Sequence, residues 1–83
     1  MYTKNVTVGN RFALTYQSEA EVVKKANEYR SELLIESDGK SANAKSLLGV
    51  LALGLVAGCK IAVSADGADE IEAVESLEKL IVA

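Results

Sequence analysis

Histidine, proline and tryptophan are absent from this 83-residue chain, and cysteine occurs only once, at Cys59. A single cysteine cannot form an internal disulfide, and Met1 leads directly into an alternating segment rather than a basic start followed by an apolar run. These features predict no signal peptide and a location in the reducing cytosol. Cys59 lies between glycine and lysine, and the more usual role for such a lone cysteine is structural.

Two partner classes are excluded by what the chain has little of. Twelve acidic residues outnumber nine basic ones, for a net charge of −3, whereas nucleic-acid binding needs clustered cationic side chains. The longest apolar run, residues 47–59, is interrupted by three glycines and falls well short of the roughly 20 residues of a membrane span. We therefore expect neither a nucleic acid nor a membrane as partner.

The size and composition favour one small globular domain over residues 1–83, with 49% hydrophobic and 25% charged residues. Its first half begins with strict alternation over residues 2–8, which predicts a strand with one buried face. A helix is expected to start at Ser18, which with Glu21 forms a capping-box pattern, and to bury a face formed by Ala20, Val23, Ala26 and Asn27. Residues 32–37 and 40–43 then read as a hairpin around Asp38-Gly39.

The second half repeats the mixture of helix and strand. Ser46 precedes a short apolar helix, Gly58 is expected to end the connection after it, and residues 60–65 alternate as a fourth strand. Asp69 is the predicted N-cap of a final helix, and Ile71, Val74, Leu77 and Ile81 are expected to form the buried stripe of that helix. The order β-α-β-β-α-β-α predicts an α+β open-faced sandwich, a four-stranded antiparallel sheet covered on one side by three helices.

The stretch DGKSANAKSLLGVLALGLVAGCKIAVSADGADE, residues 38–70, resembles the HPr family, the small phosphocarrier proteins of the bacterial sugar phosphotransferase system. The resemblance lies in the hairpin, the KS-Leu-Leu-Gly helix start and the A-x-G-x-D-E turn, and it extends over essentially the whole chain. It implies the HPr fold, a non-enzymatic protein that acts on other proteins, and no cofactor or metal.

The chain departs from this family where the phosphoryl-accepting histidine is expected. The family pattern Gly-hydrophobic-His-Ala-Arg-Pro-Ala is here ALTYQSE, so Thr15 replaces the histidine and Gln17 replaces the arginine. Residues at the expected helix start, Ser18 and Glu19 among them, would also disfavour an incoming phosphate there. The resemblance therefore implies no histidine relay and no catalytic residue. Phosphate esters of Thr15 or Tyr16 would be too inert for a carrier.

Ser46 has two possible roles. As a helix cap it needs no modification, and replacement by alanine would cost about 1 kcal/mol. In the resembling family the matching serine is phosphorylated by a dedicated kinase and then binds a transcriptional regulator, and a dianion is favoured near a helix start. Lys40 and Lys45 are close in sequence and would lower the electrostatic cost further. We favour the regulatory role.

The helix after Ser46 is apolar on more than one side. If Val50 and Leu53 point inward, then Leu47, Leu48 and Leu51 point outward and form a docking patch together with Lys45. The alternative places all three leucines in the core.

We thus interpret the chain as an HPr-like regulatory adaptor, similar to the catabolite-repression variant of HPr. By resemblance its partners are HPr serine kinase/phosphorylase and either a transcriptional regulator or phosphotransferase enzymes. Two alternatives stay open: an unphosphorylated scaffold or decoy that presents the docking face, and a phosphocarrier with a non-histidine acceptor.

Overall fold

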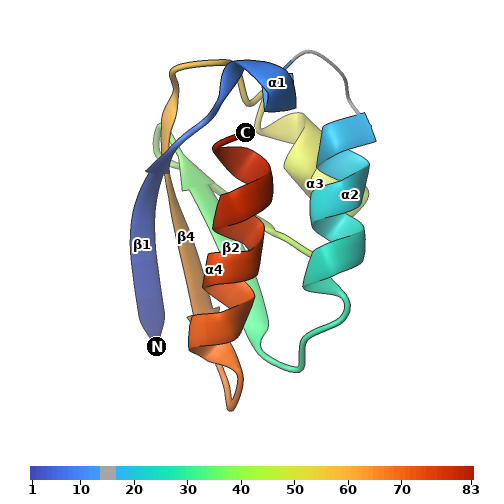
Figure 1. Cartoon of the computed structure of the whole chain (residues 1–83), viewed down its shortest axis with the longest axis vertical. Helices are drawn as coiled ribbons and strands as arrows, with labels where there is room; N and C mark the ends of the chain where they lie inside the picture. Colours follow the sequence, from blue (N-terminus) through green and yellow to red (C-terminus); the bar gives the residue numbers. More distant parts are fainter. Residues whose placement is uncertain (14–16) are drawn as a thin grey trace.

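A computed structural model describes residues 1–13 and 17–83 and has the predicted architecture, a four-stranded antiparallel sheet with helices packed on one face (Figure 1). The strands lie in the order β1-β4-β2-β3. In chain order the elements are β1 (Tyr2–Thr7), α1 (Asn10–Ala13), α2 (Gln17–Ala26), β2 (Glu32–Ser37), β3 (Lys40–Asn43), α3 (Leu47–Ala52), β4 (Lys60–Asp66) and α4 (Glu70–Ile81). The predicted α+β open-faced sandwich is confirmed.

The core lies between the sheet and the helices. Strand side chains alternate between the two faces of a sheet, so every second residue of β2 and β4 faces the helices. Helices α2 and α4 run across this face and cover it (Figure 1). The buried residues that form the contact are Leu33, Ile35, Ile61, Val63 and Ala65 from the strands and Val22, Ala26, Val74, Leu77 and Ile81 from the helices.

The β2–β3 hairpin is confirmed at the predicted dipeptide. Asp38 and Gly39 both have positive φ, 52° and 78°, and Ser37 pairs with Lys40 across the turn. Two consecutive left-handed residues match the right-handed twist of the strands, which is why Asp-Gly is favoured at this position. The hairpin sets the register of β3 and thereby fixes where the chain leaves the sheet toward α3.

The first half of the helical layer differs from the prediction in two ways. The short helix α1 was not predicted, because four residues are too few to show helical periodicity. Helix α2 begins at Gln17, so Ser18 lies inside its first turn and the prediction of Ser18 as N-cap is wrong. On α2 Ala26 is buried as predicted and Val23 is partly buried, but Val22 is buried in place of Ala20, which is exposed.

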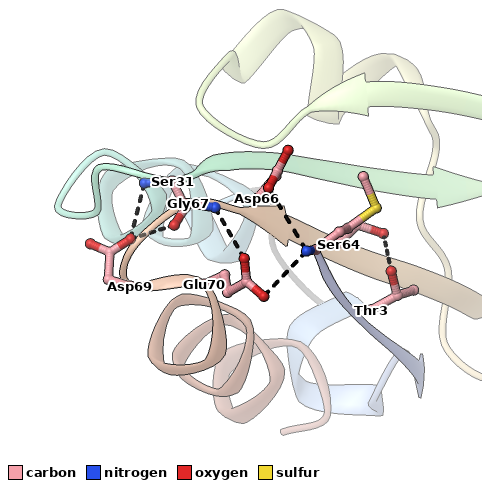
Figure 2. Close-up of polar contacts among 8 residues, drawn as sticks. Thr3, Ser31, Ser64, Asp66, Gly67, Asp69 and Glu70 are labelled. Atoms are coloured by element: carbon pink, nitrogen blue, oxygen red, sulfur yellow. Dashed lines mark hydrogen bonds and ion pairs between the residues drawn. The ribbon is translucent and has the colours of Figure 1, made fainter.

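The start of α4 is tied to the segment before β2 (Figure 2). Asp69 is the N-cap by position, but its carboxylate makes no cap bond to its own helix. It accepts instead from Ser31 Oγ at 2.5 Å and from the backbone N–H groups of Ser31 and Arg30 at 3.0 and 2.9 Å. These bonds lower the pKa of Asp69 from 3.8 to about 2, the Ser31 hydroxyl contributing most.

The buried stripe of α4 is also shifted from the predicted one. Val74, Leu77 and Ile81 are buried as expected, whereas Ile71 is 54% exposed and Ala73 is fully buried in its place. Ile71 lies two residues after Asp69, in the first turn of α4. Within residues 1–13 and 17–83 no helix has the length and apolar character to cross a membrane.

Candidate functional site

Ser46 is the N-cap of α3. Its backbone is extended, with φ −108° and ψ 115°, and its Oγ accepts a hydrogen bond from the Gly49 N–H at 3.3 Å. The Ser46 carbonyl accepts the first helical bond from the Val50 N–H at 3.0 Å. Because the side chain is exposed and the cap bond uses only an oxygen lone pair, the hydroxyl proton stays available for donation. The predicted capping role is confirmed.

The turn before Ser46 is fixed by Asn43. Its side-chain Oδ1 accepts from the Lys45 N–H at 2.8 Å, and its carbonyl accepts from the Ser46 N–H at 3.0 Å. A side-chain oxygen that bonds the backbone two residues ahead mimics a turn and holds the chain in a non-helical conformation. Asn43 therefore determines where the strand ends and in which direction the chain enters α3.

Lys45 is not a free surface cation. Its Nζ donates to the carbonyl of Tyr29 at 2.8 Å, and its own carbonyl accepts from Asn27 Nδ2 at 3.2 Å. Tyr29 and Asn27 follow the end of α2, where exposed carbonyls attract a cation. In the unmodified protein the half-buried ammonium of Lys45 contacts the Tyr29 carbonyl, and a lower electrostatic cost for a phosphate on Ser46 stays a prediction.

The outward apolar patch agrees with the prediction. Val50 is fully buried and Leu53 packs partly against the core, whereas Leu47, Leu48 and Leu51 are 41%, 81% and 37% exposed. The alternative in which all three leucines belong to the core is therefore wrong. An apolar surface of this kind, next to an exposed modifiable hydroxyl, is typical of a protein-binding face.

The charge around Ser46 is of one sign in the sequence. Residues 39–65 include no aspartate or glutamate and three lysines, Lys40, Lys45 and Lys60. Lys40 is exposed at the start of β3. Six of the twelve acidic residues lie instead between the end of β4 and the last turns of α4, and two of these, Asp66 and Glu70, pair with the Met1 amino group (Figure 2). A dianion on Ser46 would meet no like charge from its own segment.

The start of α2 offers less chemistry. Thr15, the position at which the family resemblance places the histidine, lies outside the described residues, and Gln17 is the exposed first residue of α2. Glu19 is partly buried in the first turn, and burial raises the pKa of its carboxyl. The chain has no histidine at any position.

Cys59 has an ordinary structural environment. It is half-buried, packs against the core and lies 3.5 Å from Ser37 Oγ. This agrees with the structural role inferred from the sequence.

Comparison with known proteins gives the family. A sequence profile described as "PTS HPr component phosphorylation site" matches residues 2–83. The chain belongs to the HPr family. Phosphocarrier protein HPr of Haemophilus influenzae is 43% identical over 81 residues, which are 98% of this chain and 95% of the relative. HPr-like protein Crh of Halalkalibacterium halodurans is 40% identical over 77 residues, 93% of this chain and 92% of the relative.

The fold of HPr is found in solved structures as well. The crystal structure of HPr-C-His from Thermoanaerobacter tengcongensis matches with a TM-score of 0.91 at 34% identity, covering 98% of this chain and 91% of that chain. The family assignment predicted from residues 38–70 is thus confirmed. At the level of the family, the chain is a relative of the HPr and Crh proteins of the phosphotransferase system.

Sequence reasoning missed two residues that shape this site, Asn27 and Tyr29. The helical spacing predicts Asn27 on the buried face of the first long helix, but Asn27 is exposed and lies in the turn after α2. Its Nδ2 bonds both Val23 O at 2.8 Å and Lys45 O. The asparagine just past the last helical turn was the available signal, since asparagine is common where helices end.

Proposed function

We propose that this HPr family member is a regulatory adaptor that carries no phosphoryl group on histidine and is controlled by phosphorylation of Ser46. One observation carries the proposal: an exposed serine hydroxyl lies at the start of α3, directly beside the exposed leucines of the same helix. The relatives named phosphocarrier HPr and HPr-like Crh support the protein class. The lack of any histidine favours the regulatory branch over the carrier branch.

The modification is a transfer from ATP. Ser46 Oγ forms a bond to the γ-phosphorus, the bond from that phosphorus to the β–γ bridging oxygen breaks, ADP leaves, and the hydroxyl proton passes to a base of the kinase. The product places about two negative charges beside the unpaired N–H groups of the first turn of α3, where an anion is favoured. The cap geometry therefore accommodates both the free and the phosphorylated serine.

The docking surface in this proposal consists of Leu47, Leu48 and Leu51 together with Lys45. Its partners would be an HPr serine kinase/phosphorylase, which modifies Ser46, and a transcriptional regulator of carbon use or a phosphotransferase enzyme in the cytosol. Exposed apolar side chains supply the affinity in such contacts, while a charge added at the rim changes which partner is preferred.

The decisive experiment is incubation of the purified protein with ATP and an HPr serine kinase, followed by intact-mass and fragment analysis. We expect a mass gain of one phosphoryl group located on Ser46, and no gain in Ser46→Ala. A parallel incubation with phosphoenolpyruvate and the upstream phosphotransferase enzyme should leave the protein unlabelled. Label in that second reaction would instead support a carrier with a non-histidine acceptor.

A second function, an unphosphorylated scaffold or decoy, is favoured by the same leucine patch, which needs no modification to bind. It predicts that the kinase leaves Ser46 unmodified while a phosphotransferase enzyme still binds. Leu48→Ser, which alters the most exposed leucine at 81%, should weaken that binding at least as much as any other single change in α3.

A further inference from the structure

The three polar groups of Lys45 are all engaged within the chain. Its N–H donates to Asn43 Oδ1, its carbonyl accepts from Asn27 Nδ2, and its ammonium donates to the Tyr29 carbonyl. Two of these three contacts, those to Asn27 and Tyr29, reach a segment 16 to 18 residues away in sequence. We call these two contacts the Lys45 clip.

The clip joins two parts of the helical layer. On one side, Tyr29 is anchored in the fold: it packs partly against the core, and its hydroxyl lies 2.5 Å from Ser76 Oγ of α4. On the other side, Lys45 is the residue immediately before the cap of α3. The clip thus connects the end of α2, and through Tyr29 also α4, to the backbone that carries Ser46.

The geometry of Ser46 needs such support. Helix α3 has only six residues, so its own hydrogen bonds contribute little to holding its first turn. The cap bond from Gly49 is long at 3.3 Å, and Ser46 is exposed. A serine in this position keeps one orientation only if the residue before it is fixed from outside the helix.

We propose that Lys45 and Asn27 are positioning residues, which hold Ser46 in the extended cap conformation that the modifying kinase recognises. This inference rests on the proposed phosphorylation of Ser46 and adds how the serine is presented. When the serine is already held in the bound conformation, the kinase does not have to order the segment around it. Loss of this positioning lowers the rate of phosphoryl transfer and not only the affinity. Lys45 acts here through its contacts within the chain, not as a counter-ion for the phosphate.

The chain offers well-matched variants. Lys45→Met keeps an unbranched stem of similar length and removes the donor, whereas Lys45→Arg keeps a donor that can reach a carbonyl. Lys40→Met removes the same charge from strand β3; Lys40 is exposed, and its side chain makes no hydrogen bond or ion pair within the described residues. Comparison of the two methionine variants separates the effect of the clip from the effect of charge.

The first measurement is the Gly49 amide resonance in two-dimensional NMR spectra. Ser46→Ala gives its position without the cap bond. In Lys45→Met we expect it to move toward that position, whereas in Lys45→Arg and Lys40→Met it should stay near the wild-type position. Should Lys45→Met fail to fold, Asn27→Ala removes the other contact of the clip and carries the same test.

The second measurement is steady-state phosphorylation by an HPr serine kinase, well below the melting temperature of every variant. For Lys45→Met we expect kcat/KM to fall about tenfold, mostly through kcat, with Lys45→Arg restoring most of it. An unchanged Gly49 resonance, or rates for Lys45→Met within twofold of Lys40→Met, would overturn the proposal. If the wild type is not phosphorylated at all, the proposed function fails, and the Gly49 resonance alone decides whether the clip positions Ser46.

Discussion

Replacing Ser46 by alanine tests how the modifiable hydroxyl is used in the unmodified protein. The change removes the acceptor of the Gly49 N–H, which is the one side-chain hydrogen bond of Ser46 within the described residues. Loss of an N-cap serine costs about 0.5–2 kcal/mol. The 3.3 Å bond is longer than the usual range, and water can reach the exposed site, so we place Ser46→Ala in the lower half, at about 0.5–1 kcal/mol. For a domain of this size that lowers Tm by about 3–6 °C.

Calorimetry and urea unfolding would measure this effect, with Ser41→Ala as the control. Ser41 is an exposed serine on β3, so its replacement should change stability by less than about 0.5 kcal/mol. If Ser46→Ala costs no more than Ser41→Ala, the capping bond is not formed in solution. A loss above about 3 kcal/mol would show instead that the hydroxyl belongs to a buried network, in which a phosphate could not be accommodated.

Three other predictions concern the frame of the site. Leu77→Ala should cost about 2–5 kcal/mol in urea unfolding because its side chain is fully buried, whereas Ile71→Ala on the same helix should cost under about 1 kcal/mol, since Ile71 is largely exposed. The pKa of Asp69 is lowered to about 2 in the fold, so its contribution to stability is complete above pH 4 and is lost as pH falls through 2. In Asp69→Asn the free energy of unfolding should therefore depend less steeply on pH in this window. Gly67→Ala should lower Tm and shift the Ser31 resonances, because a Cβ at Gly67 would lie 2.6 Å from Ser31 Oγ, and an unchanged Tm would contradict that contact.

The elements that local sequence predicts well are those with a strong period or a dedicated turn. Residues 32–37 and 40–43 match β2 and β3, because alternation and the Asp38-Gly39 turn depend only on neighbouring residues. Ser46 was likewise recognised as a cap from its place before an apolar run. The family itself could be read from one continuous stretch, and the comparisons agree.

The wrong predictions share a different cause. A serine with a glutamate three residues later fits the capping-box pattern and predicts Ser18 as a cap, yet α2 begins one residue earlier. Asp69 has the residue type and position of a cap, but Ser31 and the N–H groups before β2 compete for its carboxylate. A local motif lists the bonds a side chain can make, and the surrounding fold selects among them.

The sequence alone determined the class of fold, the HPr family, the lack of a histidine and the place of Ser46 at a helix start, since periodicity, turn chemistry and composition are local properties. Only the tertiary structure decided that the three leucines of α3 face outward and that the ammonium of Lys45 is bound to the Tyr29 carbonyl. Those outcomes depend on which segments packing brings together across 16 or more residues of chain, and no pattern within one segment encodes that meeting.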